Sequence, residues 1–233
     1  HSTGFAELDV APERNCLPLP DDVSLEAGAI LDVYACAVHA AQRTPATPAD
    51  TVAVIGTGPI GLAAIEMYRA LGVRQVVACG RRDEALEVAR SLGADALVNV
   101  ARDDVVGAIH DLTGGAGADV VIEAVGGASS DLSLALALVA PNGALGILGL
   151  FEGPQALDPD EAMRRQIRIA WINSYGTWDG VREFEIALNM VCAGRFHPQI
   201  LITHRFPLEA IGEAFAAAAD KGASGATKVI VMP

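Results

Sequence analysis

Between residues 51 and 193, short apolar runs alternate with longer stretches of helical periodicity. Six of these runs predict strands, at residues 51–55, 75–79, 96–100, 119–125, 144–150 and 167–172. Their apolar residues are consecutive rather than alternating, which is typical of strands that helices cover on both faces. Because strands and helices repeat with short turns, the strands must be parallel and joined by right-handed crossovers. The sequence therefore predicts an α/β fold with a doubly wound, parallel, six-stranded Rossmann sheet.

Helices are predicted in the intervals between these strands. They are expected to end at Leu71, to run from Asp83 to Leu92, to end near Leu112, and to run from Ser130 to Val139 and from about Gly180 to Ala193. Each interval is long enough for the crossover that a parallel sheet requires.

The residues on either side of this pattern differ from it. A proline-rich segment precedes an apolar helical stretch from Ala27 to Ala41, and the prolines of residues 43–50 favour a linker. Near the other end we expect a helix from Leu208 to Ala219 and a final strand at residues 227–233. Residues 1–44 and 196–233 are therefore expected to belong to a second lobe, and residues 45–195 to form the sheet domain.

Composition and charge limit the possible partners. Of the 233 residues, 52% are hydrophobic and 19% are charged, so the chain can bury a core and is not intrinsically disordered. The net charge is −13 and there is no basic run, which argues against nucleic acid and anionic membranes as partners. No apolar run is long enough to span a membrane. The first residues, HSTGFAEL, lack the features of a signal peptide, and without an initial methionine we expect the chain to begin inside a longer protein.

The cysteines argue against two further features. Four are present, widely scattered and without a C-x-x-C pair or a Cys/His cluster. We therefore expect neither a structural zinc site nor disulfides, and we expect reduced thiols in a cytoplasmic protein.

A glycine motif follows the first predicted strand. The sequence Gly56-Thr57-Gly58-Pro59-Ile60-Gly61 matches G-x-G-x-x-G at the junction between a strand and a helix. In that setting Gly56 permits the tight turn, Gly58 lets a pyrophosphate approach the backbone, and Gly61 lets the helix pack on the strand. Free N–H groups at the positive end of the helix would then bind the phosphates. The alternative is a glycine-rich turn that binds nothing.

The residues after the second predicted strand bear on the choice of cofactor. NAD-binding folds usually place an acidic residue about 20 residues after the glycine motif, on the ribose hydroxyls. This chain has Gly80, Arg81 and Arg82 at that position. Two guanidinium groups without a carboxylate suit the 2′-phosphate of NADP(H), so NAD is the less favoured cofactor. The alternative is that both arginines are solvated and that Asp83 or Glu84 caps the next helix.

Several of these segments resemble one protein family, the medium-chain, zinc-type alcohol and polyol dehydrogenases. The similarity covers essentially the whole chain, through GFAEL (4–8), LPLPDDVSLEAGA, VHAA (38–41), VAVIGTGPIGLAAIE, SLGADALVN, DVVIEAVGG, LITHRFPLEAIGEAF and KVIV. CGRR at 79–82 resembles the Gly-x-Arg arrangement of NADP-dependent secondary-alcohol members. The resemblance implies zinc-assisted hydride transfer between NADP(H) and a small alcohol or carbonyl substrate in the intact enzyme.

The resemblance also implies a metal ligand. When LDVYACAVHAA (31–41) is laid on the helix that supplies the family's third zinc ligand, Asp32 takes that position, and a carboxylate is a suitable zinc ligand. The family's other ligands, a Cys and a Gly-His-Glu motif, have no counterpart in this chain, nor does its four-cysteine lobe. The two flanking segments are thus implied to be remnants of a GroES-like catalytic lobe. The alternative role for Asp32 is to cap its helix.

Further cofactor contacts are implied by the same family. Val125 and Gly126 would line the adenosine side, Leu148, Gly149 and Leu150 would offer backbone groups to the carboxamide, Asn173 and Ser174 would lie near the nicotinamide ribose, and Lys228 would reach the pyrophosphate. For Lys228 the alternative is a solvent-facing strand lysine.

Two other functions stay open. One is a zinc-free enoyl or quinone reductase of the same superfamily, although such enzymes need no ligand at the position of Asp32. The other is a non-catalytic nucleotide-binding module. The apolar strand at 167–172 is expected to form an edge of the sheet. In relatives such edges pair across a two-fold axis. We therefore expect a homodimer or homotetramer.

Overall fold

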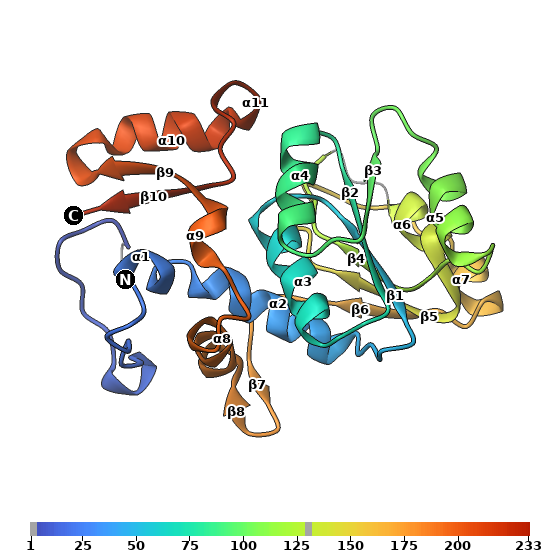
Figure 1. The fold of residues 1–233 in the computed structure, drawn as a ribbon, viewed down its shortest axis with the longest axis horizontal. Helices are drawn as coiled ribbons and strands as arrows, with labels where there is room; N and C mark the ends of the chain where they lie inside the picture. Colours follow the sequence, from blue (N-terminus) through green and yellow to red (C-terminus); the bar gives the residue numbers. More distant parts are fainter. Residues whose placement is uncertain (1–3, 129–131) are drawn as a thin grey trace.

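The computed structural model describes residues 4–128 and 132–233. Six parallel strands form its main sheet, in the order β3-β2-β1-β4-β5-β6 (Figure 1). Their bounds are β1 Thr51–Ile55, β2 Gln75–Gly80, β3 Ala96–Asn99, β4 Ala118–Glu123, β5 Val139–Ile147 and β6 Arg168–Trp171. The order reverses between β1 and β4, where a parallel α/β sheet leaves a crevice at its carboxyl edge. The doubly wound Rossmann sheet predicted from the apolar runs is confirmed.

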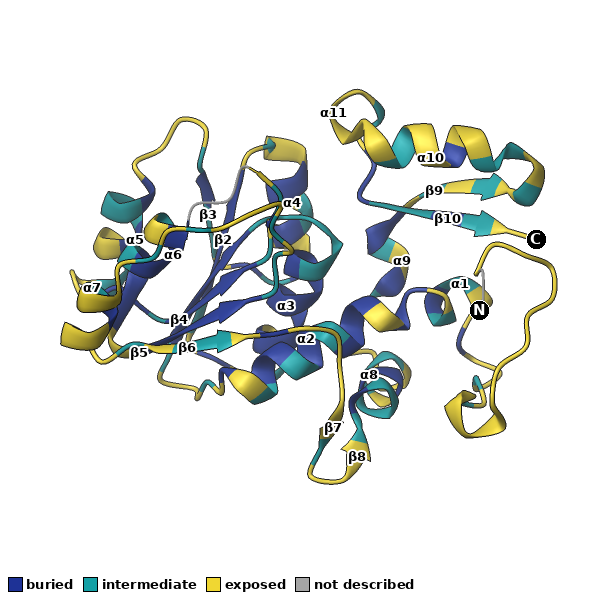
Figure 2. Cartoon of the chain, turned by 180° about the vertical axis from the view of Figure 1, so that it is seen from behind, coloured by how far each residue is buried: buried dark blue, intermediate teal, exposed yellow. Residues whose placement is uncertain are grey.

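Helices cover both faces of this sheet. One face carries α2 (Leu31–Arg43), α3 (Pro59–Ala70) and α4 (Asp83–Ser91), and α8 (Glu183–Cys192) packs on α2. The other carries α5 (Val105–Thr113), α6 (Leu132–Leu138) and α7 (Pro159–Arg164). The buried residues of the central strands lie between these two layers (Figure 2). No helix among residues 4–128 and 132–233 is long and apolar enough to cross a membrane.

Two predicted helices differ from the observed ones. The stretch from Ala27 to Ala41 is broken into α1 (Leu25–Gly28) and α2, because Ile30 leaves the helical conformation with φ −120° and ψ 14°. The helix predicted from Gly180 begins only at Glu183, since a hairpin of β7 (Thr177–Trp178) and β8 (Val181–Arg182) precedes it.

Local turn chemistry explains the hairpin. Asp179 and Gly180 connect its strands with φ angles of 49° and 82°, and an Asp-Gly pair tolerates two such angles in succession. The predicted start of the fourth helix at Ser130 lies outside the described residues.

The end of the chain forms a smaller unit beside the main sheet. Strands β9 (Ile202–Pro207) and β10 (Lys228–Met232) pair in parallel, and the 3-10 helix Leu208–Ala210, α10 (Ile211–Ala219) and α11 (Lys221–Ser224) connect them. Figure 1 shows this pair apart from the six strands, with α9 (Pro198–Leu201) leading into it. The segment before α1, which includes the 3-10 helix Glu13–Asn15, lies on the surface of the same unit (Figure 2). The domain boundaries at residues 44 and 195 stay a prediction.

A buried carboxylate joins α2 and α3 to the segment that leads into α9. Glu66, 2% exposed, accepts hydrogen bonds from the Tyr34 hydroxyl at 2.8 Å and from the backbone N and Nδ1 of His197 at 2.9 and 2.8 Å. The Tyr34 ring stacks on Phe196, with 4.6 Å between ring centroids. Burial raises the pKa of Glu66, and the hydrogen bonds from His197 and Tyr34 oppose that shift. The three elements are thereby fixed relative to one another.

Candidate functional site

The glycine motif forms the turn between β1 and α3. Gly56 has φ +106°, and α3 begins with Pro59 at its first position, followed by Ile60. A Cβ on Gly61 would overlap the carbonyl oxygen of Gly56, so Gly61 is required for the close contact between helix and turn. A Cβ on Gly58 would meet no atom within 4 Å. Gly58 thus borders open space at the start of α3, where unpaired N–H groups favour an anion.

The end of β2 carries two arginines and no carboxylate. Gly80 is its last residue, and a Cβ there would stand 2.6 Å from Oγ1 and 2.8 Å from Cγ2 of Thr57. Because no rotation of Thr57 clears both contacts, an acidic side chain cannot be introduced at this position without moving the glycine turn. Arg81 is exposed, whereas Arg82 is half-buried and donates from Nη1 to the backbone oxygen of Lys221 at 3.0 Å.

A third basic group lies beside these arginines, and the sequence pattern did not single it out. Lys221, the first residue of α11, has its pKa lowered by burial and then by the charges of Arg82 and Lys228. Arg82 and Lys228, which come from other elements, each lie close enough to repel the ammonium group of Lys221. Positive charges that lie together with no carboxylate between them repel one another, which costs free energy. A bound anion would offset this cost.

The loops after β4 and β5 are held together by one buried carboxylate. Glu123, 0% exposed at the end of β4, accepts hydrogen bonds from the backbone N–H groups of Val125 and Gly126, both at 2.9 Å, and of Gly149 at 3.2 Å. Gly127 N donates to the Leu150 oxygen at 2.6 Å, which joins the two loops directly. Glu123 lies within an apolar run, so sequence reasoning took it for a strand residue.

Close packing of these two loops accounts for their glycines. Gly126 has φ +64°, and a Cβ on it would stand 2.5 Å from Leu150 N. A Cβ on Gly149 would overlap the Glu123 carboxylate. Leu148 is half-buried, while Val125 and Leu150 are 47% and 79% exposed. The structure therefore brings all the predicted residues of both loops to the carboxyl edge of the sheet.

Asn173 and Ser174 also follow this edge, after β6. Both are exposed, and Ser174 has φ +62°. The segment behind them is fixed by Glu183, whose buried carboxylate accepts from Gly176 N at 2.5 Å and contacts His39 Nδ1 at 2.9 Å. Since His39 belongs to α2, this contact connects the end of β6 to that helix.

Asp32 lies in the first turn of α2 and is exposed. The residue that caps α2 is Ile30, and no side chain caps the helix, so the capping role considered for Asp32 is wrong. The pKa of the Cys36 thiol is raised to about 11, mainly by burial and then by the charges of Asp32 and Glu183, while the charge of Lys228 opposes the shift. Burial, Asp32 and Cys36 raise the pKa of Tyr175. Cys36 thus lies near Asp32, Tyr175 and Lys228.

The described residues offer no complete set of ligands for a metal ion. Within the described ranges 4–128 and 132–233, no three His, Cys, Asp or Glu residues are grouped so that they could hold a metal ion. All four cysteines are free. Asp32 therefore has no set of fellow ligands in this part of the chain.

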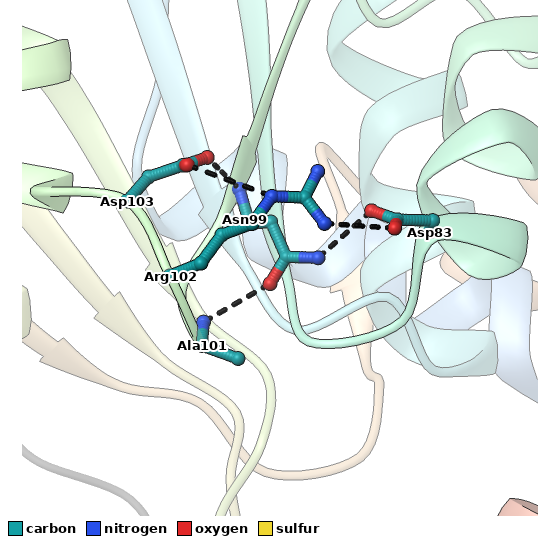
Figure 3. Close-up of polar contacts among 5 residues, drawn as sticks. All are labelled: Asp83, Asn99, Ala101, Arg102 and Asp103. Carbon is teal, nitrogen blue, oxygen red and sulfur yellow. Dashed lines mark hydrogen bonds and ion pairs between the residues drawn. The ribbon is translucent and has the colours of Figure 1, made fainter.

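A polar network lies beside the two arginines, at the end of β3 (Figure 3). The Asp83 carboxylate accepts from Asn99 Nδ2 and from Arg102 Nη1, both at 2.8 Å. These bonds hold the pKa of Asp83 below its ordinary value, with Arg102 the larger cause. The residue that caps α4 is Arg82, and no side chain caps that helix. The alternative in which Asp83 or Glu84 caps α4 is thus wrong.

Comparison with known proteins connects this geometry to one family. Residues 59–191 match the model of the family described as zinc-binding dehydrogenase. The L-idonate 5-dehydrogenase of Vitis vinifera is 32% identical over 226 residues, which are 94% of this chain and 60% of that protein. The L-threonine 3-dehydrogenase of Bacillus subtilis (strain 168) is 33% identical over 216 residues, 91% of this chain and 60% of that protein. The chain spans about three fifths of the length of these curated relatives.

Solved structures agree with the sequence comparison. The alcohol dehydrogenase from Thermus sp. ATN1 is 30% identical with a TM-score of 0.80, and the match covers 92% of this chain and 61% of that one. A protein from Sinorhizobium meliloti 1021, solved bound to NADP, is 27% identical with a TM-score of 0.86, over 99% of this chain and 66% of that one.

Proposed function

Because the chain belongs to the zinc-binding dehydrogenase family, we propose that the intact protein is an NADP(H)-dependent oxidoreductase that interconverts an alcohol and a ketone or aldehyde. The substrate would be a small alcohol or carbonyl compound. Relatives named as alcohol, L-idonate and L-threonine dehydrogenases support this reaction class. The bound NADP of the Sinorhizobium meliloti protein supports the cofactor.

One observation carries the choice of NADP(H) over NAD(H). Arg82, Lys221 and Lys228 converge beside the end of β2, where Gly80 supplies no carboxylate. The 2′-phosphate distinguishes the two cofactors, and arginine binds phosphate through paired, charge-assisted hydrogen bonds. The same cationic group would bind NAD(H) without its usual acidic contact on the ribose.

The chain's own residues would bind and orient the cofactor. Backbone N–H groups at the start of α3 would bind the pyrophosphate over Gly58, which leaves the space open. The loops that Glu123 holds together would line the adenosine and carboxamide sides through Gly126 and Gly149. NADP⁺ supplies the hydride acceptor when it is bound, and the fold sets the position of its ring.

The metal is a separate matter. The described residues do not form a zinc site by themselves, so no step of the reaction is assigned to zinc here. We propose Asp32 as one ligand, because it is exposed in the first turn of α2, and further ligands would have to come from outside the described residues. In the intact enzyme, Asp32→Asn would lower zinc retention and turnover, while cofactor affinity would be unchanged. Unaltered zinc content in that variant would contradict the assignment.

Titration of the chain with NADPH and NADH tests the cofactor. A charge-assisted hydrogen bond is worth roughly 1.5–3 kcal/mol, and each 1.4 kcal/mol is about a tenfold change in affinity. We expect NADPH to bind at least about tenfold more tightly, and Arg81→Ala/Arg82→Ala to remove that preference. The matched control is Arg90→Ala/Arg164→Ala, which removes two exposed arginines from α4 and α7. Equal affinities of the unaltered chain for the two cofactors would contradict the proposal.

A second candidate function is a nucleotide-binding module without catalysis. The lack of a three-residue metal group among the described residues favours it for the chain taken alone. Bound zinc together with alcohol oxidation by the intact protein would support the oxidoreductase. Cofactor binding without either property would support the module.

A further inference from the structure

The chain does contain a carboxylate close to the two arginines, although it is not at the end of β2. Asp83 directly follows Arg82 and is the first residue of α4, and its side chain is 59% exposed. A free carboxylate here would pair with the neighbouring guanidinium groups. It would also repel a phosphate dianion and offer acceptors to ribose hydroxyls, which is how NAD-selecting folds bind that sugar.

In the structure this carboxylate is engaged elsewhere. Its Oδ1 accepts from Asn99 Nδ2 and its Oδ2 accepts from Arg102 Nη1, both at 2.8 Å (Figure 3). Both oxygens therefore face the end of β3. The lowered pKa of Asp83 agrees with this geometry, because the bond from Arg102 favours the ionised form.

The two partners are themselves held in place. Asn99 is 4% exposed, and its Oδ1 accepts from Ala101 N at 3.0 Å, which turns its NH₂ group toward Asp83. Asn99 N donates to Asp103 Oδ2 at 2.7 Å, and Asp103 Oδ1 lies 3.7 Å from Arg102 Nε (Figure 3). The two groups that donate hydrogen bonds to Asp83 are thus oriented before any cofactor binds.

We propose that Asn99 and Arg102 are specificity-determining residues that hold the Asp83 carboxylate away from the nucleotide and so preserve the preference for NADP(H). This inference rests on the proposed function. Arg102 acts here as a positioning residue, through Asp83, and does not itself bind the 2′-phosphate. Loss of either partner frees a negative charge beside Arg82, which weakens binding of NADPH more than binding of NADH.

The test is a titration of the 233-residue chain and its variants with NADPH and NADH, read as the ratio of the two dissociation constants. Arg102→Ala is expected to reduce the preference for NADPH up to about fivefold, the range of exposed charge interactions. Asn99→Ala is expected to act in the same direction. Arg102→Ala/Asp83→Asn is expected to restore the ratio of the unaltered chain, because the released group no longer carries a charge.

One control variant accompanies the test, and each possible outcome has a distinct meaning. Arg90→Ala removes an exposed arginine of α4 that pairs with Glu87 rather than Asp83, and it should leave the ratio unchanged. An unchanged ratio in Arg102→Ala would overturn the inference. A loss that Asp83→Asn does not restore would also overturn it, since Arg102 would then bind the phosphate directly. Equal weakening of both cofactors would indicate a purely structural role and overturn it too. A preference of the unaltered chain for NADH would overturn the proposed function, and this inference with it.

Discussion

The guanidinium of Arg82 donates a hydrogen bond from Nη1 to the backbone oxygen of Lys221, 3.0 Å away and 139 positions later in the sequence. The contact joins the end of β2 in the main sheet to α11 in the smaller unit. It brings the backbone of Lys221 beside Arg82, and the charge of Arg82 contributes to the lowered pKa of the Lys221 ammonium group. Cofactor recognition would therefore draw on both units of the fold.

We predict that Lys221→Ala lowers the affinity for NADPH about three- to fivefold and leaves the affinity for NADH nearly unchanged. Lysine acts on a phosphate as a point charge, so the effect should shrink as salt is added. Titration at about 0.05 M and at about 0.5 M salt measures the effect, because the Debye length shortens from above about 10 Å to below about 8 Å over this range. Lys221→Arg is the control and should retain the preference. Equal loss of both cofactors would show that Lys221 only supports the fold.

Substitutions at Gly58 and Gly61 of the glycine motif should separate effects on stability from effects on cofactor binding. Gly61→Ala is expected to lower the free energy of unfolding by about 1–3 kcal/mol, because the new Cβ overlaps the Gly56 carbonyl. Gly58→Ala meets no atom and has φ −80°, so stability should stay the same or rise by up to about 1 kcal/mol.

NADPH affinity should respond to Gly58→Ala in the opposite sense to stability. The added methyl group lies where the pyrophosphate approaches the backbone, and we expect affinity to fall at least about tenfold. Urea denaturation and NADPH titration of the same samples give both quantities. Undiminished binding by Gly58→Ala would exclude this glycine from the phosphate site.

The sequence predicts those features that residues adjacent in the chain signal, and it does not predict contacts that depend on packing. Consecutive apolar residues mark β1, and the glycines after it mark the turn, because both signals lie within a few positions of each other. Glu123 escaped notice because one acidic residue inside an apolar run gives no sign that it binds backbone groups of two loops. Lys221 could not be connected with Arg82 because their contact depends on how the two units pack. The Asp179-Gly180 hairpin could have been predicted, since that pair is a strong turn signal.

The outer edge of β6 supports a proposal about assembly. Trp171 is 62% exposed at this edge and packs against Phe151, with 6.5 Å between ring centroids, and Leu150 nearby is 79% exposed. Exposed apolar edge strands tend to be covered, and we propose that a second copy of the chain pairs here about a two-fold axis. We predict a dimeric mass at micromolar concentration and a monomeric mass for Trp171→Lys. Leu112→Lys on α5, which is 38% exposed on a helix that contacts β3 at the opposite edge of the sheet, is the control and should leave the mass unchanged.

The contact of Glu66 with Tyr34 and His197 makes stability depend on pH with a definite sign. Burial raises the pKa of Glu66 above its ordinary value of 4.5, so the folded chain binds this proton more tightly than the unfolded chain. The contribution is therefore fully present below pH 4.5 and is lost as the pH rises through the folded-state pKa. Glu66→Gln keeps the shape of the side chain and removes the titration.

We predict that the free energy of unfolding of the unaltered chain, minus that of Glu66→Gln, decreases as the pH is raised from 4.5 toward 8. Urea denaturation of both proteins at several pH values in this range measures the difference, and titrating groups that do not contact Glu66 cancel in the subtraction. Tyr34→Phe removes a donor to the carboxylate, at 2.8 Å, and should steepen the decrease because the ionised form then has fewer hydrogen bonds. A difference that grows with pH would mean that these hydrogen bonds outweigh the cost of burying the charge.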